Sequence, residues 1–430
     1  MRSRRIHRRR LSTALHGLLC GLALLAIVPA LAAAATGGAG QEPGAAARET
    51  GGAGGEVEEA PVEQAPPLGN TAFDRQGMWI WYVSQSDGGS IGSIVARAKR
   101  FGIGTVYVKA GDGPGQWSQF SSALVGALHE GGIDVCAWQY VYGEHPVAEA
   151  KVGIAAVQDG ADCLAIDAES EYEGRYASAE RYLQTLRAAV GESFPISLAG
   201  FPYVDYHPAF PYSVFFGPGG AQYNQPQMYW KAIGTSVRAV YEHTFLFNRI
   251  WGRPVYPVGQ TYEGPGNANL RLFRRFAASY DGHPPSWWDW QETGGKEWGA
   301  LGAASALRPL TGYRQSFEQP LLKRGSKGDM VVWAQEHLIS AGEETPINGI
   351  LGKRTVRAVR EFQEAHSLEV DGQLETTTWS ALLAYGPAPV RWGATASRAG
   401  ASASRVRPAH RPLSASLPPK AEEIPSGGMP

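Results

Sequence analysis

The stretch Cys163-Leu-Ala-Ile-Asp-Ala-Glu-Ser-Glu171 decides the fold, because an apolar run there ends abruptly in acidic side chains. A short apolar run of this length is typical of a strand buried on both faces, as the strands of parallel sheets are. In α/β folds the functional groups follow the carboxyl ends of such strands. The stretch therefore predicts a parallel strand that ends at a functional site.

Similar runs lie on both sides of this stretch, and amphipathic helical patterns fill most of the gaps between them. The predicted strands are Gly77–Val83, Thr105–Lys109, Asp134–Tyr140, Cys163–Ala168, Pro195–Ala199, Gln225–Trp230, Pro254–Gly259 and Ser286–Gln291. The predicted helices are Ser93–Phe101, Ser121–Glu130, Val147–Gln158, Ala177–Val190, Ser236–Phe247 and Asn269–Ser279. This alternation predicts an α/β fold of the (β/α)8 TIM-like barrel type. A doubly wound sheet is the alternative, and it is disfavoured because no glycine-rich phosphate turn follows the first strand.

Two carboxyl groups end the fourth predicted strand. Asp167 and Glu169 are two residues apart, so their side chains face the same side of the strand, with Cα atoms about 6.5–7 Å apart. Their mutual repulsion, beside aromatic side chains that exclude water, should raise the pKa of one of them. A carboxyl that stays protonated near neutrality is a general acid for a glycosidic oxygen. We predict that Glu169, nearer the rim, is this acid, and that Asp167 stabilises positive charge or positions a reacting group.

The alternative is that these carboxylates only cap barrel loops or pair with Lys109. A second catalytic carboxylate is sought among other strand ends, and the candidates are Asp205, Glu263 and Asp289, with Glu171 beside them. Because a sequence gives no carboxyl separation, retaining, inverting and substrate-assisted hydrolysis all stay open.

Substrate-binding candidates also follow the strands. Amide and ammonium groups would donate to sugar hydroxyls or to an acetamido group, and aromatic rings would stack on the apolar faces of sugars. The donors are Lys109, Gln139, Gln227 and Gln291, and the aromatic residues are Tyr140, Tyr203, Tyr229, Trp288 and Trp290. We expect Trp288 and Trp290 to share one face of the last strand. Each donor has a structural role as its alternative.

Composition excludes several classes of function. The 430 residues hold 39 Lys and Arg against 40 Asp and Glu, a formal net charge of −1, and arginine is concentrated in the first ten residues. This balance gives no support for a nucleic-acid partner. The histidines and cysteines show no metal-ligand spacing, and no serine or cysteine nucleophile pattern is present. We therefore expect no cofactor and no metal.

The two ends of the chain differ in composition from its middle. Arginines precede an apolar run at 15–31 and small residues at 32–35, so residues 1–35 are predicted to be a signal peptide, with an uncleaved anchor as the alternative. We expect a disordered acidic linker over 36–70, a barrel over 71–301, a connector over 302–317, a small helical domain over 318–386 and a disordered basic tail over 387–430.

After signal cleavage no membrane-spanning segment remains, so the predicted location is extracellular and associated with the cell wall. Cys136 and Cys163 both lie in strand-like stretches. We expect two small buried thiols there, with a disulfide between them as the alternative.

The predicted all-α domain contains an internal repeat. Asn348-Gly349 and Asp371-Gly372 are each followed, six residues after the glycine, by a threonine beside a packed apolar residue. With the glycines of Leu322-x-x-Gly325-x-x-Gly328 and with Gln335-x-x-Leu338, Phe362-Gln363 and Thr378-Trp379, the domain resembles the three-helix peptidoglycan-binding module of wall hydrolases. The resemblance implies that peptidoglycan or another wall polysaccharide is the partner.

The barrel motifs Lys109-Ala-x-Asp112-Gly, Trp138-x-Tyr140, Asp167-x-Glu169 and Trp290-Gln291 resemble the lysozyme-type muramidases. That resemblance implies cleavage of the peptidoglycan glycan, with Glu169 as proton donor. The chain departs from the family on the first strand, where Trp79-Ile-Trp-Tyr82 stands in place of an aspartate. Asp162, Asp167 and Glu169 also partly match the chitinase-type signature, although Ala165 replaces an aspartate. The motifs Lys109-Ala-Gly-Asp-Gly113 and Trp287-Trp-x-Trp-Gln291 together are most similar to those of secreted actinobacterial glycoside-hydrolase-like proteins.

Two hypotheses follow. The first is an exported, muramidase-like hydrolase that is held on the wall by its C-terminal domain, where tethering raises the effective substrate concentration. The second is a non-catalytic polysaccharide-binding protein with a degenerate barrel, which the missing aspartate favours.

Overall fold

The computed structural model describes residues 70–303 and 308–393. Eight parallel strands form a sheet in the order β7-β6-β5-β4-β2-β1-β9-β8, and isolated bridges from Asn224 to Val255 and from Gln227 to Val258 join its two edges. The strands are β1 Gly77–Ile80, β2 Thr105–Asp112, β4 Asp134–Val141, β5 Cys163–Ala168, β6 Ile196–Gly200, β7 Tyr223–Pro226, β8 Val258–Gln260 and β9 Ser286–Trp288. The predicted (β/α)8 TIM-like barrel is confirmed.

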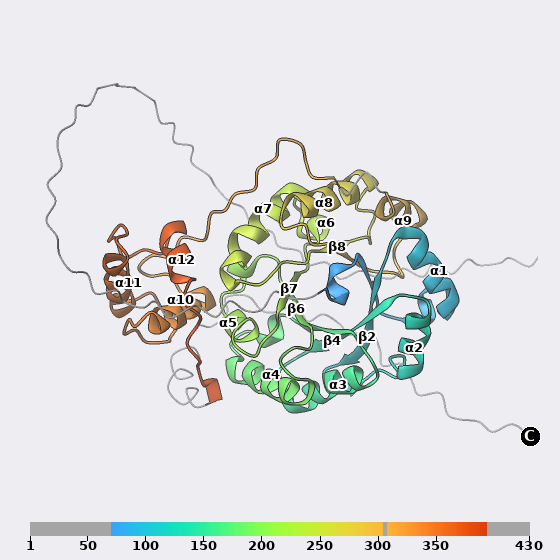
Figure 1. Ribbon diagram of the computed structural model, residues 1–430, viewed down its shortest axis with the longest axis horizontal. Coiled ribbons are helices and arrows are strands. Elements are labelled where there is room, and N and C mark those ends of the chain that lie inside the picture. The colour runs from blue at the N-terminus through green and yellow to red at the C-terminus, as the bar shows by residue number, and fades with distance from the viewer. Residues whose placement is uncertain (1–69, 304–307, 394–430) are drawn as a thin grey trace, which may run out of the picture. The chain divides into compact units, whose positions relative to one another are not determined.

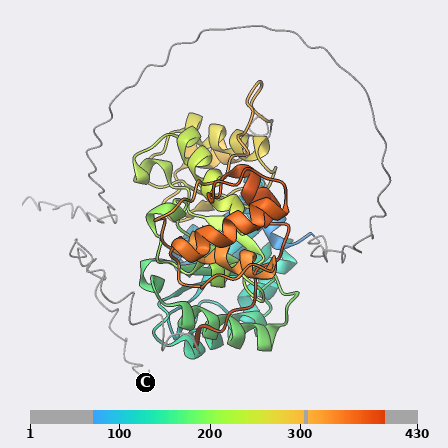
Figure 2. The same cartoon turned by 90° about the vertical axis from the view of Figure 1, so that its left-hand side faces the viewer.

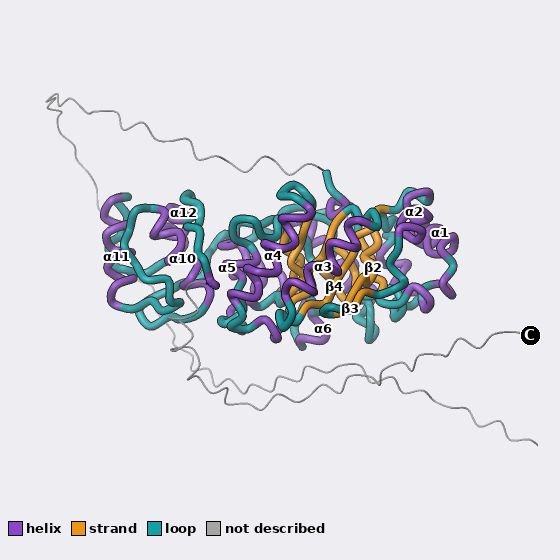
Figure 3. The backbone as a smooth tube through the Cα atoms, turned by 90° about the horizontal axis from the view of Figure 1, so that it is seen from below, coloured by secondary structure: helices purple, strands orange, loops and turns teal. Residues whose placement is uncertain are grey.

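Helices surround this sheet, as Figures 1 and 3 show. They are α1 Ile91–Phe101, α2 Ser122–Glu130, α3 Pro146–Gln158, α4 Tyr176–Val190, α5 Tyr212–Phe215, α6 Trp230–Ile233, α7 Val237–Asn248, α8 Asn267–Ser279 and α9 Gly295–Leu301. A short strand, β3 (Gly115–Gln116), pairs antiparallel with the end of β2. The predicted strand Gln225–Trp230 ends earlier than expected, because Trp230 begins α6 and packs its ring on Phe273 of α8.

Alternation along the strands separates two cores. On β4, Cys136 and Trp138 point into the barrel, where they join an interior cluster with Trp79 of β1 and Tyr107 of β2. Val135 and Ala137 point outward into the larger core between sheet and helices. Both faces of the strands are therefore buried, which explains their almost continuously apolar sequences.

A short N-terminal segment, which sequence patterns did not reveal, fills one end of the barrel. In the 3₁₀ helix η1 (Ala72–Asp74), the ring of Phe73 is 1% exposed and lies 4.6 Å from that of Tyr223, centroid to centroid. Thr105 donates its hydroxyl to the carbonyl of Ala72 at 2.6 Å. Because Thr105 begins β2, this end is the amino-terminal end of the barrel, and the carboxyl end stays available for chemistry.

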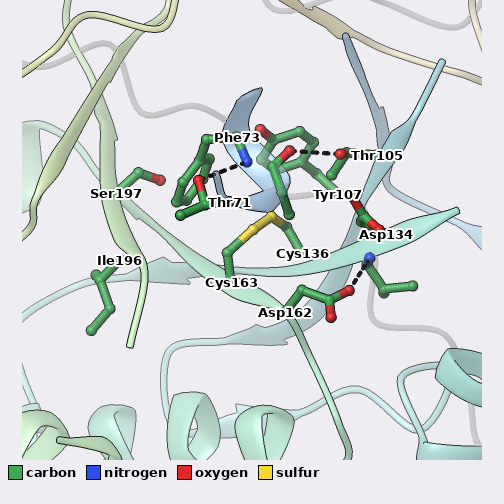
Figure 4. Close-up of a disulfide and its surroundings, with 12 residues drawn as sticks. Thr71, Phe73, Thr105, Tyr107, Asp134, Cys136, Asp162, Cys163, Ile196 and Ser197 are labelled. Atoms are coloured by element: carbon green, nitrogen blue, oxygen red, sulfur yellow. Dashed lines mark hydrogen bonds between the residues drawn. A yellow bond between two sulfur atoms is a disulfide. The ribbon is translucent and has the colours of Figure 1, made fainter. Parts of the chain in front are cut away.

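Cys136 and Cys163 form a disulfide, where two free thiols were expected. Cys136 of β4 pairs in register with Cys163 of β5, and their Cα atoms are 4.5 Å apart. Figure 4 shows the bond inside the barrel, near Phe73 and Tyr107. The physical reason is the strand register, which places both side chains on the interior face at the same level.

Three C-terminal helices, which Figure 2 shows facing the viewer, pack around a hydrogen-bonding pattern that occurs twice. They are α10 Asp329–Ser340, α11 Lys353–Ala365 and α12 Thr376–Leu382. The buried Gln335 accepts the backbone N–H of Gly349 at 3.0 Å and donates to Thr355 Oγ1 at 3.0 Å. Gln363 does the same with Gly372 at 2.8 Å and Thr378 at 3.1 Å. The sequence repeat is therefore a pair of turns, each locked by one buried glutamine.

We expect Gln335→Leu to lower the free energy of unfolding by about 3 kcal/mol, because it leaves buried N–H and hydroxyl groups without partners. Urea unfolding followed by tryptophan fluorescence measures this. The control is Gln184→Leu, on an exposed site of α4, which should stay within about 0.5 kcal/mol of the unsubstituted chain. Equal midpoints for the two variants would show that the buried glutamine does not lock its turn.

The predicted signal peptide and nearly all of the predicted linker, together with most of the predicted basic tail, lie outside the described residues. Within 70–303 and 308–393, the helices include none with the length and apolar character required to cross a bilayer.

Candidate functional site

The two predicted carboxyl groups lie together at the carboxyl end of β5. Asp167 is 7% exposed, and Glu169, one residue beyond the strand, is half-buried. The side-chain amide of Gln227, just after β7, donates to Asp167 Oδ1 at 2.9 Å and to Glu169 Oε1 at 3.2 Å. One amide thus holds both carboxyls, and each keeps a second oxygen.

The surroundings favour the protonated forms of this pair. Burial raises the pKa of Asp167 well above its ordinary value, and the neighbouring Glu169 adds to that rise. Burial also raises the pKa of Glu169. The amide of Gln227 opposes both shifts by stabilising the charged forms. Two carboxyls this close titrate as a unit, so the pair holds a shared proton to higher pH than an isolated carboxyl would.

A tyrosine on β4 connects this region to a third carboxylate, Glu171. Tyr140 pairs in register with Asp167 and donates its hydroxyl to Glu171 Oε2 at 2.8 Å. Burial, followed by the charges of Glu169, Glu171 and Asp167, raises the pKa of this phenol far above its ordinary value. Tyr140 is therefore a neutral hydrogen-bond donor in the site.

Lys109 of β2 is committed to protein partners. Its side chain is 3% exposed and its ammonium lies 2.6 Å from Asp112 Oδ2. The rings of Trp81, Trp117 and Trp138 surround the ammonium, with centroids 5.1, 4.6 and 4.8 Å away. The ammonium of Lys109 thus has an ion-pair partner and aromatic neighbours within the chain, and its role as a donor to sugar stays a prediction.

Aromatic rings extend from the interior to the rim. Trp288 of β9 lies 5.3 Å from Trp138 and 5.8 Å from Trp81, between ring centroids. Trp81 is 36% exposed and stacks nearly parallel on Tyr82, 5.6 Å away. Tyr229, half-buried after β7, contacts Tyr262 edge to face at 5.8 Å. Such a surface suits the apolar faces of sugar rings.

The three candidates for a second carboxylate lie in different surroundings. Asp289 is 3% exposed, and burial raises its pKa to about 7. Its charge acts on the phenol of Tyr229, as do those of Asp167 and Glu169, so it borders the same region. Asp205 instead lies 2.7 Å from His243, and Glu263 is exposed. Among these candidates, Asp289 has the position closest to what the prediction required.

Some predicted substrate-binding residues lie away from the interior. Gln139 is fully buried on the outer face of β4, where it donates to the carbonyl of Glu149 in α3 at 2.8 Å. Strand alternation alone could have indicated this, because its neighbours Trp138 and Tyr140 face inward. Trp290 packs edge to face on Trp298 of α9 at 4.9 Å, rather than with Trp288, because β9 ends at Trp288.

Two more candidates have local partners. Gln291 accepts the backbone N–H of Trp81 at 3.3 Å and so supports the aromatic rim. Tyr203 lies against the ring of His243, 3.9 Å away. Two residues of the site were missed from sequence: Trp117, over Lys109, and Gln119, which donates to the carbonyls of Trp81 and Lys109 at 2.7 and 3.0 Å. Both come from an irregular loop, where no periodic pattern marks a side chain.

The described part of the chain contains no group of three or more His, Cys, Asp or Glu side chains arranged to hold a metal ion.

Comparison with known proteins gives one family match. The family described as "Putative peptidoglycan binding domain" matches residues 327–382. No curated protein matches the sequence.

Solved structures give low-similarity matches. A chitinase from Chromobacterium violaceum is 11% identical with a TM-score of 0.39, over 54% of this chain and 99% of that one. A family 39 glycoside hydrolase from Bacteroides cellulosilyticus is 11% identical with a TM-score of 0.42, over 60% of this chain and 68% of that one. The catalytic domain of an endolysin from a Listeria monocytogenes bacteriophage is 16% identical with a TM-score of 0.24, over 30% of this chain and 66%, just under two thirds, of that one. The family match is thus confined to the helical domain, which is similar to peptidoglycan-binding domains.

Proposed function

We propose that this chain is an exported glycoside hydrolase that cleaves peptidoglycan or a related amino-sugar glycan, in the manner of a muramidase, while its C-terminal domain holds it on the cell wall. The observation that supports this most is the pair Asp167 and Glu169, bridged by one amide beside an aromatic rim. The match of residues 327–382 to peptidoglycan-binding domains supports the choice of polymer.

In the proposed reaction Glu169 is the general acid. It gives its proton to the glycosidic oxygen as the bond from that oxygen to the anomeric carbon breaks, so the leaving sugar departs as an alcohol. Asp167, when ionised, stabilises the positive charge that develops on the sugar ring. Water then completes hydrolysis at the anomeric carbon and restores the proton to Glu169. Burial, which raises the pKa of Glu169, keeps this acid protonated at higher pH.

The disulfide between Cys136 and Cys163 supports export, because such bonds persist in oxidising compartments and are rare in the cytosol. Removal of residues 1–35 as a signal peptide belongs to the same proposal. The second candidate is a polysaccharide receptor without turnover. It is favoured by the end of the first strand, which carries Trp81 and Tyr82. The lysozyme-type muramidases that the barrel resembles have an aspartate on this strand.

The test is incubation of the purified chain with isolated peptidoglycan and with chitooligosaccharides, measuring new reducing ends. We expect release from at least one substrate, and mass spectrometry of the products identifies the sugar at the new end. Sedimentation with insoluble peptidoglycan measures binding separately. Binding without any release would favour the receptor, and the absence of both would contradict the proposal.

A further inference from the structure

The end of β2 contains a bulge that changes which residues face the barrel interior. Lys109 pairs with Trp138 of β4, but the next pairs are Gly111 with Gln139 and Asp112 with Tyr140, so Ala110 is an extra residue in β2. Such bulges re-aim side chains, and they are common near functional sites.

The extra residue reverses the alternation of β2. In a regular strand Lys109 and Asp112, three positions apart, would face opposite sides. Here both pair with inward-facing residues of β4, whereas Gly111 faces outward, where a Cβ would overlap Val152 of α3. The bulge therefore brings a lysine and an aspartate together inside the barrel mouth.

Both members of this ion pair have further partners, although the side chain of Asp112 stays 36% exposed. Asp112 accepts from Lys109 at 2.6 Å with one carboxylate oxygen and from the hydroxyl of Tyr142 at 2.7 Å with the other. Three tryptophan rings enclose the ammonium. Bringing a lysine to 3% exposure costs free energy even when it is paired, and this burial places a fixed positive charge in a region of low dielectric.

Strand register places this ion pair two strands away from Asp167, with Tyr140 of β4 between them. Asp112, Tyr140 and Asp167 form one row across β2, β4 and β5, with neighbouring strands about 4.8 Å apart. The ammonium of Lys109 reaches this row through its bond to Asp112. Burial and the charge of Glu169 raise the pKa of Asp167; the charge of Lys109 opposes this rise, and that of Asp112 adds to it by less than Lys109 subtracts.

We propose that Lys109, held by Asp112 and Tyr142, is a positioning residue whose charge favours ionisation of Asp167 and so biases the shared proton of the pair towards Glu169. This rests on the proposed function, because it states how the same two carboxyls divide their roles. Lys109 contacts no reacting atom and acts only through its charge.

Other charged and titratable groups also face the pair. Glu171 lies on the same segment as the pair, and Tyr140 faces the pair from β4. His207, in the loop after β6, lowers the pKa of Glu169 by its charge. The neutral amide of Gln227 bonds both carboxyls, and the phenol of Tyr229 is influenced by the charges of Asp167, Glu169 and Asp289. These groups stay unchanged when β2 alone is altered, so a comparison of β2 variants isolates the lysine and its partner.

Two substitutions should move the pH profile in opposite directions. The acidic limb of kcat/KM reports ionisation of Asp167 in the free enzyme. Lys109→Met removes a positive charge, so the limb should move to higher pH by about one unit, a tenfold change in the ionisation constant. Asp112→Asn leaves that charge uncompensated, so the limb should move to lower pH. A purely structural pair would reduce activity without these opposite shifts.

A second readout does not need turnover. In the full chain with ¹³C-labelled carboxyl groups, NMR titration follows Asp167 and Glu169 directly, with signals assigned from Asp167→Asn and Glu169→Gln. The same opposite shifts are expected. The neutral double variant Lys109→Met/Asp112→Asn should titrate close to the unsubstituted chain, and it can replace a single variant that fails to fold.

The outcomes separate the two proposals. If the unsubstituted chain releases no reducing ends but the titrations shift in opposite directions, the hydrolase proposal fails and the electrostatic role of Lys109 stands. If the titrations coincide among all variants, or move in the same direction, the role of Lys109 is overturned whatever the activity.

Discussion

Glu169→Gln is expected to lower kcat/KM for an amino-sugar glycan by about 10³-fold, because a positioned general acid contributes about 10²–10⁴-fold. Glutamine keeps the size of the side chain and an oxygen that can accept from Gln227, which lies 3.2 Å from Glu169 Oε1. It cannot supply the proton that the departing sugar needs. Peptidoglycan binding should therefore stay within about twofold while turnover is lost, as sedimentation and reducing-end assays on one preparation would show.

The matched control is Glu130→Gln, the same chemical change at an exposed position at the end of α2. We expect its kcat/KM to equal that of the unsubstituted chain. Thermal unfolding of both variants excludes a loss caused by misfolding. Full activity in a correctly folded Glu169→Gln variant would remove this residue from the reaction and leave Asp167 or Asp289 as the acid.

The barrel could be predicted because its evidence is local. Each strand is a short apolar run, and β5 has the predicted bounds Cys163–Ala168. The pairing of Asp167 with Glu169 is local too, because two residues separated by one position face the same side of an extended segment. Gln227 and Tyr140 were predicted as sugar-binding residues, whereas the structure gives both of them carboxylate partners.

What could not be predicted depends on register between strands. The bond of Gln227 to Asp167 joins segments 60 residues apart in sequence. The inward turn of Asp112 depends on a single extra residue in β2, which no composition or periodicity marks. Likewise the plug formed by Phe73 comes from a segment too short for any periodic signal.

The disulfide belongs to the same class, and its removal should have a large effect on stability. The bond joins cysteines separated by 27 residues, and a closed loop of that size is worth about 3–4 kcal/mol in the chain-entropy model. We expect Cys136→Ala/Cys163→Ala to lower the free energy of unfolding by about that amount, measured by urea unfolding under oxidising conditions. This is a large share of the 5–15 kcal/mol that typically holds a domain folded.

A reductant supplies the control for this prediction. Dithiothreitol present throughout unfolding and refolding should lower the midpoint of the unsubstituted chain towards that of the alanine variant, and it should leave the variant unchanged. The bond lies in the barrel interior, beside Phe73 and Tyr107 (Figure 4), so reduction should need opening of the barrel and proceed faster in urea than in buffer. Equal midpoints for both chains, with and without reductant, would mean that the bond adds no stability. In that case the disulfide would no longer support the proposal that the chain is exported.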